Sequence, residues 1–277
     1  MEDDGLITPE VGVWAKEKYQ LLYKYADIFT SSMKNNWGTL VYIDLFAGAG
    51  IVRIKDTGEL VVSSPMLAVN LPNKFNKYIF CDSDREKIET LQKRVNNSTV
   101  KIEANYIIND VNESTSAIID NIPVPSKTNT ILSFCFIDPY KLDNLSFSTI
   151  ECIANARFTD FLVLVPTDMD ANRNVNIYVD PSNNNVDKFV GYNDWRKRWE
   201  NVQNPNANFG LFVLGEFSRH MEALGYKQNE NHETVLVRNQ QKNAPLYRLA
   251  FFSKHDLGKT FWKEAKKYSN PQTTMFE

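Results

Sequence analysis

Five short apolar runs, each followed by polar or acidic residues, constrain the fold of this chain more than any other feature. They lie at residues 39–45, 78–81, 104–108, 130–137 and 160–165. Segments with apolar residues at helical spacing separate them, so strands and helices alternate along the chain. Such alternation predicts an α/β fold built on a doubly wound, mostly parallel sheet with right-handed crossovers. Because ligands of these sheets bind outside the carboxyl ends of the strands, we expect the functional site at that edge.

Further elements are expected before and between these runs. Residues 11–35 carry apolar side chains at near-helical spacing, which predicts a long amino-terminal amphipathic helix. The turn residues Asp56-Thr57-Gly58 predict a small hairpin or a loop within residues 52–62. Ser63-Ser64-Pro65 predicts the start of a helix, with a serine cap and a proline at the first helical position.

The last part of the chain has a different pattern. Residues 233–238 and 246–253 predict an antiparallel hairpin, which a basic helix at 259–268 follows. Residues 168–208 are polar, rich in asparagine and too long for a plain connection, so they predict a functional insertion or lid. The alternative is a surface excursion that packs its tryptophans back on the core. We expect residues 1–277 to form a single domain.

Composition limits the classes of function. Basic and acidic residues number 31 and 34, so the net charge of -3 gives no bulk attraction for nucleic acid, and any basic surface must be local. The three cysteines lack CxxC spacing and predict reduced thiols in a cytoplasmic protein. The start MEDDGLITPE is not a signal peptide, and no apolar run approaches the ~20 residues that span a bilayer, so we expect no membrane partner. The three histidines are scattered, and we expect no metal site.

The stretch Val41–Ile51, VYIDLFAGAGI, runs from a buried strand into a glycine turn. Glycine permits positive φ and removes the Cβ that would keep a ligand away from the backbone. Asp44, at the end of the strand, can accept hydrogen bonds from a cationic or hydroxyl-bearing ligand. Gly-x-Gly alone also fits an ordinary strand-to-loop turn, so the chemistry at the other strand ends must decide.

Acidic residues follow the second and third strands as well, at Asp82 and Asp110. A dinucleotide fold would have a third glycine, which is missing after Gly50. A carboxylate after the second strand suits a ribose diol, and one after the third strand suits an adenine amino group. Together they predict a ligand that contains adenosine, with no need for a diphosphate site. Helix capping explains each acid separately, but it does not explain why both lie beside the glycine turn.

This arrangement resembles a class I S-adenosylmethionine-dependent methyltransferase, a fold that ends its sheet with a helix and an antiparallel strand pair. The resemblance implies a seven-stranded sheet and S-adenosyl-L-methionine as the cofactor. It also implies that the glycine turn lies under the methionine part, that Asp82 holds the ribose and that Asp110 contacts the adenine. The cofactor-binding residues implied in this way are Asp44, Phe46, Ala47, Gly48, Gly50, Asp82 and Asp110.

Asp138-Pro139-Tyr140 follows the fourth strand and resembles the Asp-Pro-Pro-Tyr motif of amino-group methyltransferases. The Asp138 carboxylate and the Pro139 carbonyl can accept the protons of an acceptor amine, while Tyr140 can stack on a flipped base. This chain has one proline where the motif has two, and a plain Asp-Pro turn is the alternative. A cytosine-C5 enzyme would need a Pro-Cys pair, which the sequence lacks.

Most of the chain is similar to the three-Cys-motif partner family of methyltransferase-like proteins. The similarity rests on YIDLFAGAG, Ser63-Ser64-Pro65, FIDPYKL at 136–142 and LYRLAFFSKH at 246–255. It implies the same fold and a partner protein with a cysteine motif, and it says little about the substrate.

These patterns lead to hypotheses of different classes. The first is an S-adenosylmethionine-dependent methyltransferase that acts on an exocyclic amine of a nucleic-acid base, with Asp138, Pro139 and Tyr140 as catalytic residues. The alternatives are methylation of a small-molecule or protein amine, and a catalytically silent module that binds a protein partner. Basic residues interleaved with aromatic ones suit phosphates and stacked bases, although a short charge run is more often a solvated face. The candidate substrate-binding residues of this kind are Trp195, Arg196, Lys197, Arg198 and Trp199.

Overall fold

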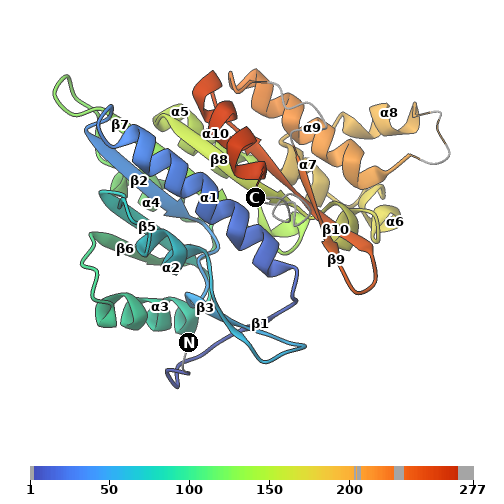
Figure 1. The fold of residues 1–277 in the computed structure, drawn as a ribbon. Coiled ribbons are helices and arrows are strands. Elements are labelled where there is room, and N and C mark those ends of the chain that lie inside the picture. Colours follow the sequence, from blue (N-terminus) through green and yellow to red (C-terminus); the bar gives the residue numbers. More distant parts are fainter. Residues whose placement is uncertain (1–2, 203, 205–206, 228–233, 268–277) are drawn as a thin grey trace.

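Seven strands form the central sheet of the computed structural model, which describes residues 3–202, 204, 207–227 and 234–267. Their order is β6-β5-β2-β7-β8-β10-β9, in which β6 to β8 are parallel and β10 runs antiparallel to both of its neighbours (Figure 1). This confirms the predicted fold class, a doubly wound, mostly parallel sheet of the class I methyltransferase type with a closing hairpin. The bounds are β2 Thr39–Asp44, β5 Lys77–Asp82, β6 Ala104–Ile108, β7 Ile131–Ile137, β8 Thr159–Val165, β9 Val235–Asn239 and β10 Ala244–Phe252.

Both faces of the sheet are buried, which explains why its central strands read as continuous apolar sequence. Side chains of β2 alternate between the faces, as the pleat requires. Val41 and Ile43 belong to one hydrophobic cluster, and Leu40 and Tyr42 belong to the other. All four are fully buried, and β2 lies next to β7, the middle strand of the sheet, so its carboxyl end lies near the middle of the sheet edge.

Helices cover each face. On the face of Leu40 and Tyr42 lie α1, α2, α3 and α10, and α1 and α10 pack against each other. On the opposite face lie α4, α5, α7, α8 and α9. The bounds are α1 Ala15–Met33, α2 Ser64–Val69, α3 Arg85–Asn97, α4 Thr115–Asn121, α5 Phe147–Ala156, α7 Asn185–Val190, α8 Trp195–Glu200, α9 Phe209–Ala223 and α10 Asp256–Lys266.

The segment predicted as an insertion or lid, residues 168–208, packs in its described part onto the face of α5 and α9. It contains most of a π-helix, η2 Thr167–Ala171, and three short helices, α6 Val175–Tyr178, α7 and α8. Phe189 and Trp195 are fully buried in the same hydrophobic cluster as α5 and α9. The described part of the segment thus packs back on the core, as in the alternative interpretation. A lid movement stays a prediction.

A second, smaller sheet lies beside the carboxyl end of the main sheet. β3 Ile51–Ile54 and β4 Leu60–Val62 form the hairpin that the Asp56-Thr57-Gly58 turn predicted. β1 Glu10–Val11, which the sequence did not predict, pairs in parallel with β3. The predicted helix of residues 11–35 therefore begins later, at Ala15, because the chain before it is extended along β3.

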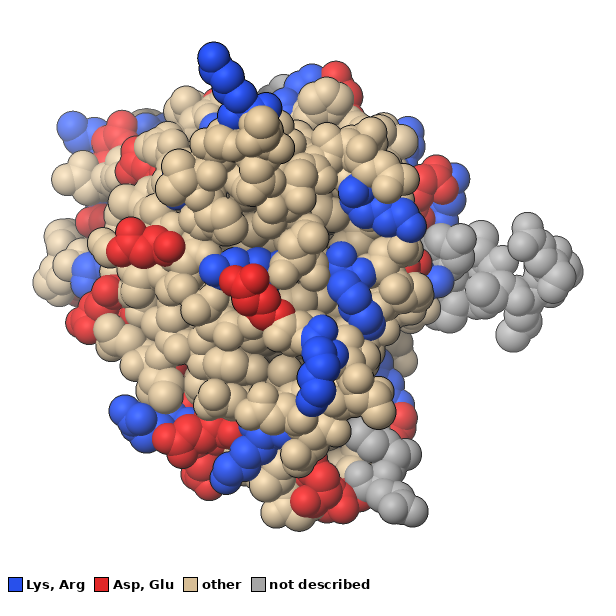
Figure 2. Space-filling view, turned by 90° about the vertical axis from the view of Figure 1, so that its left-hand side faces the viewer, with Lys and Arg blue, Asp and Glu red and all other residues tan. Residues whose placement is uncertain are grey.

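Other predicted boundaries agree within a few residues, although residues 233 and 268 lie outside the described part of the chain. No helix among the described residues is long and apolar enough to cross a membrane. Basic and acidic side chains are interspersed over the face shown in Figure 2, so no large field of one sign covers it.

Candidate functional site

A cavity of about 900 Å³ opens at the carboxyl ends of β2, β5, β6 and β7. It brings together eight of the residues predicted to bind cofactor or acceptor. They are Phe46, Ala47, Gly48, Asp82, Asp110, Asp138, Pro139 and Tyr140. Two further predicted residues, Asp44 and Gly50, lie beneath the turn and do not line the cavity. A volume of this size falls within the range of small-molecule sites.

The glycine turn after β2 has the backbone geometry that the sequence predicted. Gly48 and Gly50 have φ of 63° and 87°, a region that residues with a Cβ rarely adopt. A Cβ on Gly50 would lie 2.7 Å from Cγ of Met66 and 2.9 Å from Cδ1 of Leu91, whereas a Cβ on Gly48 would meet nothing within 4 Å. Gly50 thus allows close packing beneath the turn, and Gly48 leaves open space on the side of the cavity.

Asp82 connects the turn after β2 to the end of β5. Its Oδ2 accepts from the backbone N–H of Gly48 at 2.9 Å, and its Oδ1 accepts from the N–H of Asp84 at 2.9 Å. Asp84, not Asp82, caps α3, because its side chain accepts from the N–H groups of Glu86 and Lys87. The capping explanation of Asp82 is therefore wrong. A carboxylate that lines the cavity and keeps further lone pairs can accept from the hydroxyls of a ligand.

Asp110 has a similar arrangement after β6. Its Oδ1 accepts from the N–H of Asn112 at 2.8 Å, which forms a local turn. The helix that follows, α4, has Ser114 at its N-cap position, so Asp110 is not the cap either. Asp110 is exposed at the cavity, just after β6, the strand next to that of Asp82.

Asp44 is fully buried at the end of β2. Its Oδ2 accepts from the Tyr42 hydroxyl at 3.1 Å and its Oδ1 from the N–H of Phe46 at 3.4 Å. Burial raises the pKa of this carboxyl to about 7, an effect that the nearby Asp138 charge increases and the Ser64 and Tyr42 hydroxyls oppose. A positive ligand above the turn would favour the ionised form.

Asp138 is held by a residue that the sequence analysis missed. The ammonium of Lys18, on α1, donates to Oδ2 of Asp138, and the side chains of the pair are 10% and 18% exposed. Burial disfavours the charged form of Lys18, but the Asp138 carboxylate outweighs this effect, so the pKa of Lys18 is raised above its usual value. Pro139 is buried beside the pair, and Tyr140 is 74% exposed at the rim of the cavity.

A signal for Lys18 does exist in the sequence. Lys18 precedes Leu21, Leu22 and Tyr25 by three, four and seven residues, a spacing that places it on the buried stripe of α1. A charged residue within an apolar stripe is usually paired, and here the partner is Asp138. Spacing alone could not identify that partner, because it lies on another element.

Two tyrosines beside this ion pair were also missed, and both line the cavity. The Lys18 ammonium lies 4.9 Å from the ring centroid of Tyr19 and 6.0 Å from that of Tyr247, on β10. Burial raises the pKa of Tyr19 to about 12 and raises that of Tyr247 as well. Both hydroxyls therefore stay protonated at neutral pH and can donate.

Ser63 departs from its predicted role. It stands at the N-cap position of α2, but its side chain makes no capping hydrogen bond, and Pro65 is the second residue of the helix instead of the first. Its N–H donates to the Gly50 carbonyl at 2.9 Å, which ties the residue to the glycine turn. The Ser63 hydroxyl is buried in the cavity wall, with no hydrogen-bond partner among the described residues.

The candidate substrate residues on α8 lie away from this cavity. Trp195 is fully buried, and its indole N–H donates to Asp187 at 2.6 Å. Arg196 pairs with the same carboxylate, while Arg198 is 2.6 Å from Glu216. Trp199 packs on Phe209 and Phe212, and Lys197 is exposed. None of the five lines the cavity, because packing and ion pairs hold four of them within their own layer.

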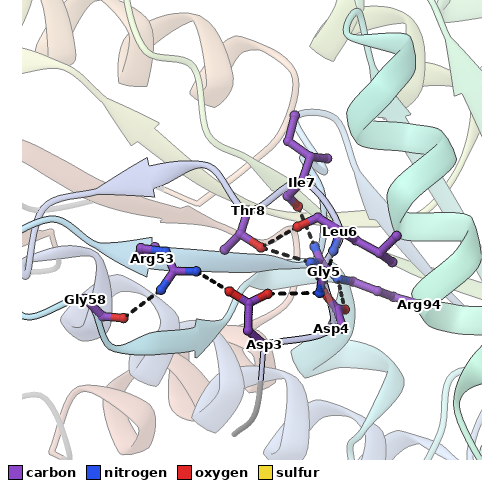
Figure 3. A network of polar contacts seen from close by, with 9 residues as sticks. All are labelled: Asp3, Asp4, Gly5, Leu6, Ile7, Thr8, Arg53, Gly58 and Arg94. Carbon is purple, nitrogen blue, oxygen red and sulfur yellow. Dashed lines mark hydrogen bonds and ion pairs between the residues drawn. The ribbon is translucent and has the colours of Figure 1, made fainter.

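An arginine network anchors the amino-terminal segment beside the glycine turn (Figure 3). The Arg94 guanidinium, on α3, donates to both oxygens of Asp4 at 2.7 and 2.8 Å. The same group donates to the Ala49 carbonyl at 2.7 Å, the Ile7 carbonyl at 3.0 Å and the Thr8 hydroxyl at 3.0 Å. Residues 9–12, which follow, line the cavity, so Arg94 fixes two of its walls.

Comparison with known proteins gives similarities of fold alone. No family model matches this chain, and no curated protein matches it. Similar solved structures include protein LPL1258 from Legionella pneumophila, with 14% identity, a TM-score of 0.49 and coverage of 91% of this chain and 93% of that one. An O-methyltransferase from Bacillus cereus in complex with SAH has 12% identity, a TM-score of 0.46 and coverage of 90% and 85%.

A third similar structure is magnesium protoporphyrin IX methyltransferase from Synechocystis with bound SAM. It has 10% identity, a TM-score of 0.42 and coverage of 88% of this chain and 85% of that one. At these values the similarities carry no argument about the site, and the fold class rests on the order and direction of the strands. Within the described residues, no group of three or more His, Cys, Asp or Glu side chains could hold a metal ion.

Proposed function

We propose that this chain is an S-adenosylmethionine-dependent methyltransferase. The observation that carries the proposal is that one cavity is lined by the glycine turn, by Asp82 and Asp110, and by the Asp138-Pro139-Tyr140 segment. Cofactor chemistry and acceptor chemistry would thus meet at one edge of the sheet, where ligands of parallel sheets bind. The two methyltransferases named above, whose structures contain SAM or SAH, agree with this proposal but do not carry it.

The donor set of the cavity fits this cofactor. Asp82 and Asp110, at the carboxyl ends of neighbouring strands, provide acceptors for the ribose hydroxyls and for the adenine amino group. Asp44 is buried beneath the turn and outside the cavity lining, and its ionised form would attract an ammonium above the turn. Gly48 leaves space above the backbone for the ligand. When bound, S-adenosylmethionine supplies an electrophilic methyl group on a sulfonium.

The acceptor in this proposal is an exocyclic amine of a nucleic-acid base. The Asp138 carboxylate and the Pro139 carbonyl accept hydrogen bonds from the two N–H groups of the amine. These bonds direct the nitrogen lone pair toward the methyl group. Tyr140, exposed at the rim, offers a ring face for a base that enters the cavity. The protein contributes position and charge, and Lys18 holds the Asp138 carboxylate in place through their ion pair.

Two observations favour a second candidate function. Lys18 already occupies one oxygen of Asp138, and the second proline of the amino-methyltransferase motif is absent. A methyltransferase fold that binds a protein partner, as the similarity to the three-Cys-motif partner family implies, would tolerate both features. In that case the cofactor would bind without methyl transfer.

Transfer of labelled methyl groups separates these functions. The purified chain is incubated with tritium-labelled S-adenosylmethionine and, in separate reactions, with DNA, RNA and a nucleic-acid-free protein extract. The proposal predicts label in a nucleic-acid fraction. Label in the protein fraction would instead indicate a protein amine. Tight cofactor binding without transfer to any fraction would favour the partner-binding module.

A further inference from the structure

The ion pair between Lys18 and Asp138 gives the acceptor side of the cavity a balanced charge. It joins the first long helix to the end of β7, 120 residues further along the chain. Oδ2 of Asp138 receives the ammonium, while Oδ1 has no hydrogen-bond partner within the described part of the chain. A free carboxylate oxygen therefore lies beside a cationic donor.

Tyr247 adds a neutral donor to the same place. The residue is 2% exposed, lines the cavity, and its ring lies within reach of the Lys18 ammonium. Its buried hydroxyl has no hydrogen-bond partner in the described parts of the chain. A buried hydroxyl left unpaired is unfavourable, so its presence in a cavity wall indicates a polar ligand atom.

These groups form a pattern of one acceptor beside donors. A complementary ligand would present an N–H to Oδ1 of Asp138 and an adjacent oxygen or nitrogen lone pair to Tyr247 or Lys18. A positively charged amine is disfavoured, because it would enter a desolvated site beside the Lys18 ammonium. A neutral amino group next to a ring nitrogen, the edge of adenine and cytosine, matches this pattern.

We propose that Lys18 and Tyr247 complete an acceptor subsite with Asp138, specific for a neutral amino group beside a ring nitrogen. The inference rests on the proposed methyltransferase function and restricts its substrate class. Lys18 is a positioning residue, since it acts through Asp138. Tyr247 contacts the ring nitrogen of the acceptor. Uracil and hypoxanthine lack the amino group that would receive the methyl group, and a lysine side chain lacks the ring nitrogen.

Matched homopolymers test the base specificity. Adenine is compared with hypoxanthine, and cytosine with uracil, in single-stranded DNA and RNA, with tritium-labelled S-adenosylmethionine as the methyl source. Polylysine serves as the charged amine. We expect label in at least one amino-base polymer and none in its oxo partner or in polylysine. Label in an oxo polymer or in polylysine, or in no polymer despite cofactor binding, would overturn the inference.

Two variants test the residues. Tyr247→Phe removes only the hydroxyl, and we expect the KM for the amino-base polymer to rise about tenfold while the Kd for S-adenosylhomocysteine changes less than about twofold. Tyr226→Phe is the control, because its buried hydroxyl bonds the Thr159 carbonyl at 3.0 Å, away from the cavity. An unchanged KM in Tyr247→Phe, or an equal rise in both variants, would contradict the role of Tyr247.

Lys18→Met and Lys18→Arg test the ion pair through the separate values of kcat and Kd. Without the ammonium that positions Asp138, we expect kcat for the amino-base polymer to fall at least tenfold in Lys18→Met, while the Kd for S-adenosylhomocysteine changes less than about twofold and Lys18→Arg restores part of kcat. A purely structural role would lower stability and leave kcat of the folded variant unchanged. Calorimetry with S-adenosylhomocysteine separates the two proposals. Failure of the unaltered chain to bind contradicts the function itself, whereas normal binding with the wrong acceptor pattern contradicts only the subsite.

Discussion

The guanidinium of Arg94 donates to the Ala49 carbonyl at 2.7 Å, which ties α3 to the glycine turn. The same side chain, 3% exposed, forms an ion pair with Asp4 of the amino-terminal segment. One residue thus holds two neighbouring walls of the cavity. The ends of β2 and β5 are also joined directly, through Asp82 and the N–H of Gly48.

Arg94→Ala should destabilise the chain by about 3 kcal/mol, because it leaves buried carbonyls without their donor. Asp4→Asn is the matched control. It removes only the charge of a partly exposed partner and should cost less than about 1 kcal/mol. Urea denaturation measures both free energies of unfolding. Equal losses in the two variants would mean that the contact with Ala49 contributes nothing.

The two glycines of the turn should respond differently to substitution. Gly50→Ala introduces a Cβ that clashes with Met66 and Leu91, so we expect a loss of more than about 2 kcal/mol in stability. Gly48→Ala has free space and should cost about 1 kcal/mol, yet its Cβ would enter the cavity. We therefore expect Gly48→Ala to lose more free energy of S-adenosylhomocysteine binding than free energy of unfolding. Calorimetry measures the first quantity and urea denaturation the second. A Gly48→Ala variant that loses stability but keeps its affinity for S-adenosylhomocysteine would exclude a ligand above Gly48.

Cofactor affinity should depend on pH through Asp44. In the free chain its pKa is raised to about 7, so below that pH the carboxyl is mostly protonated. A ligand with an ammonium favours the ionised form, and binding must then release a proton. The association constant should rise with pH, by up to about tenfold per unit, and level off above about pH 7. Calorimetric titrations across this pH range measure the association constant. Asp44→Asn should bind the ligand more weakly, and its association constant should not change with pH. A wild-type profile as flat as that of the variant would refute the role of Asp44.

The α8 residues should behave as structural rather than substrate-binding residues. Trp195→Ala empties a fully buried site and should cost about 4 kcal/mol in the free energy of unfolding. Lys197→Ala, at an exposed position of the same helix, should change stability by less than about 0.5 kcal/mol. It should also leave the KM for nucleic acid unchanged. A several-fold rise in KM for Lys197→Ala would indicate that α8 contacts the substrate.

The architecture could be predicted because each inference used only the pattern of residues within one short stretch of sequence. Apolar runs of strand length gave the strands, and the acids at 82 and 110 marked the edge where the cavity opens. The hairpin of β9 and β10 followed from alternating sequence. These inferences needed no knowledge of which helix lies next to which strand end.

The acceptor side required tertiary contacts that local pattern does not contain. Lys18, near the start of the chain, pairs with Asp138, and Tyr247, near the other end, has its ring 6.0 Å from that ammonium. No spacing rule links these three residues. Ser63 had the sequence of a cap, but its hydroxyl makes no capping hydrogen bond and lies in the cavity wall. Trp195 and Arg196 had the composition of a binding surface, yet Asp187 and the core engage them.

Calorimetric titration with S-adenosylhomocysteine tests the central claim most directly, with Asp82→Ala and Asp84→Ala as the paired variants. Asp82 lines the cavity, whereas Asp84 does not line it, caps α3 and pairs with Lys87 at 3.2 Å. We predict saturable binding by the unaltered chain and at least a tenfold loss of affinity in Asp82→Ala, about the effect of one charged hydrogen bond. Asp84→Ala should lose about 1 kcal/mol of stability and keep its affinity. No binding by the unaltered chain, or equal affinity in Asp82→Ala, would contradict the cofactor site.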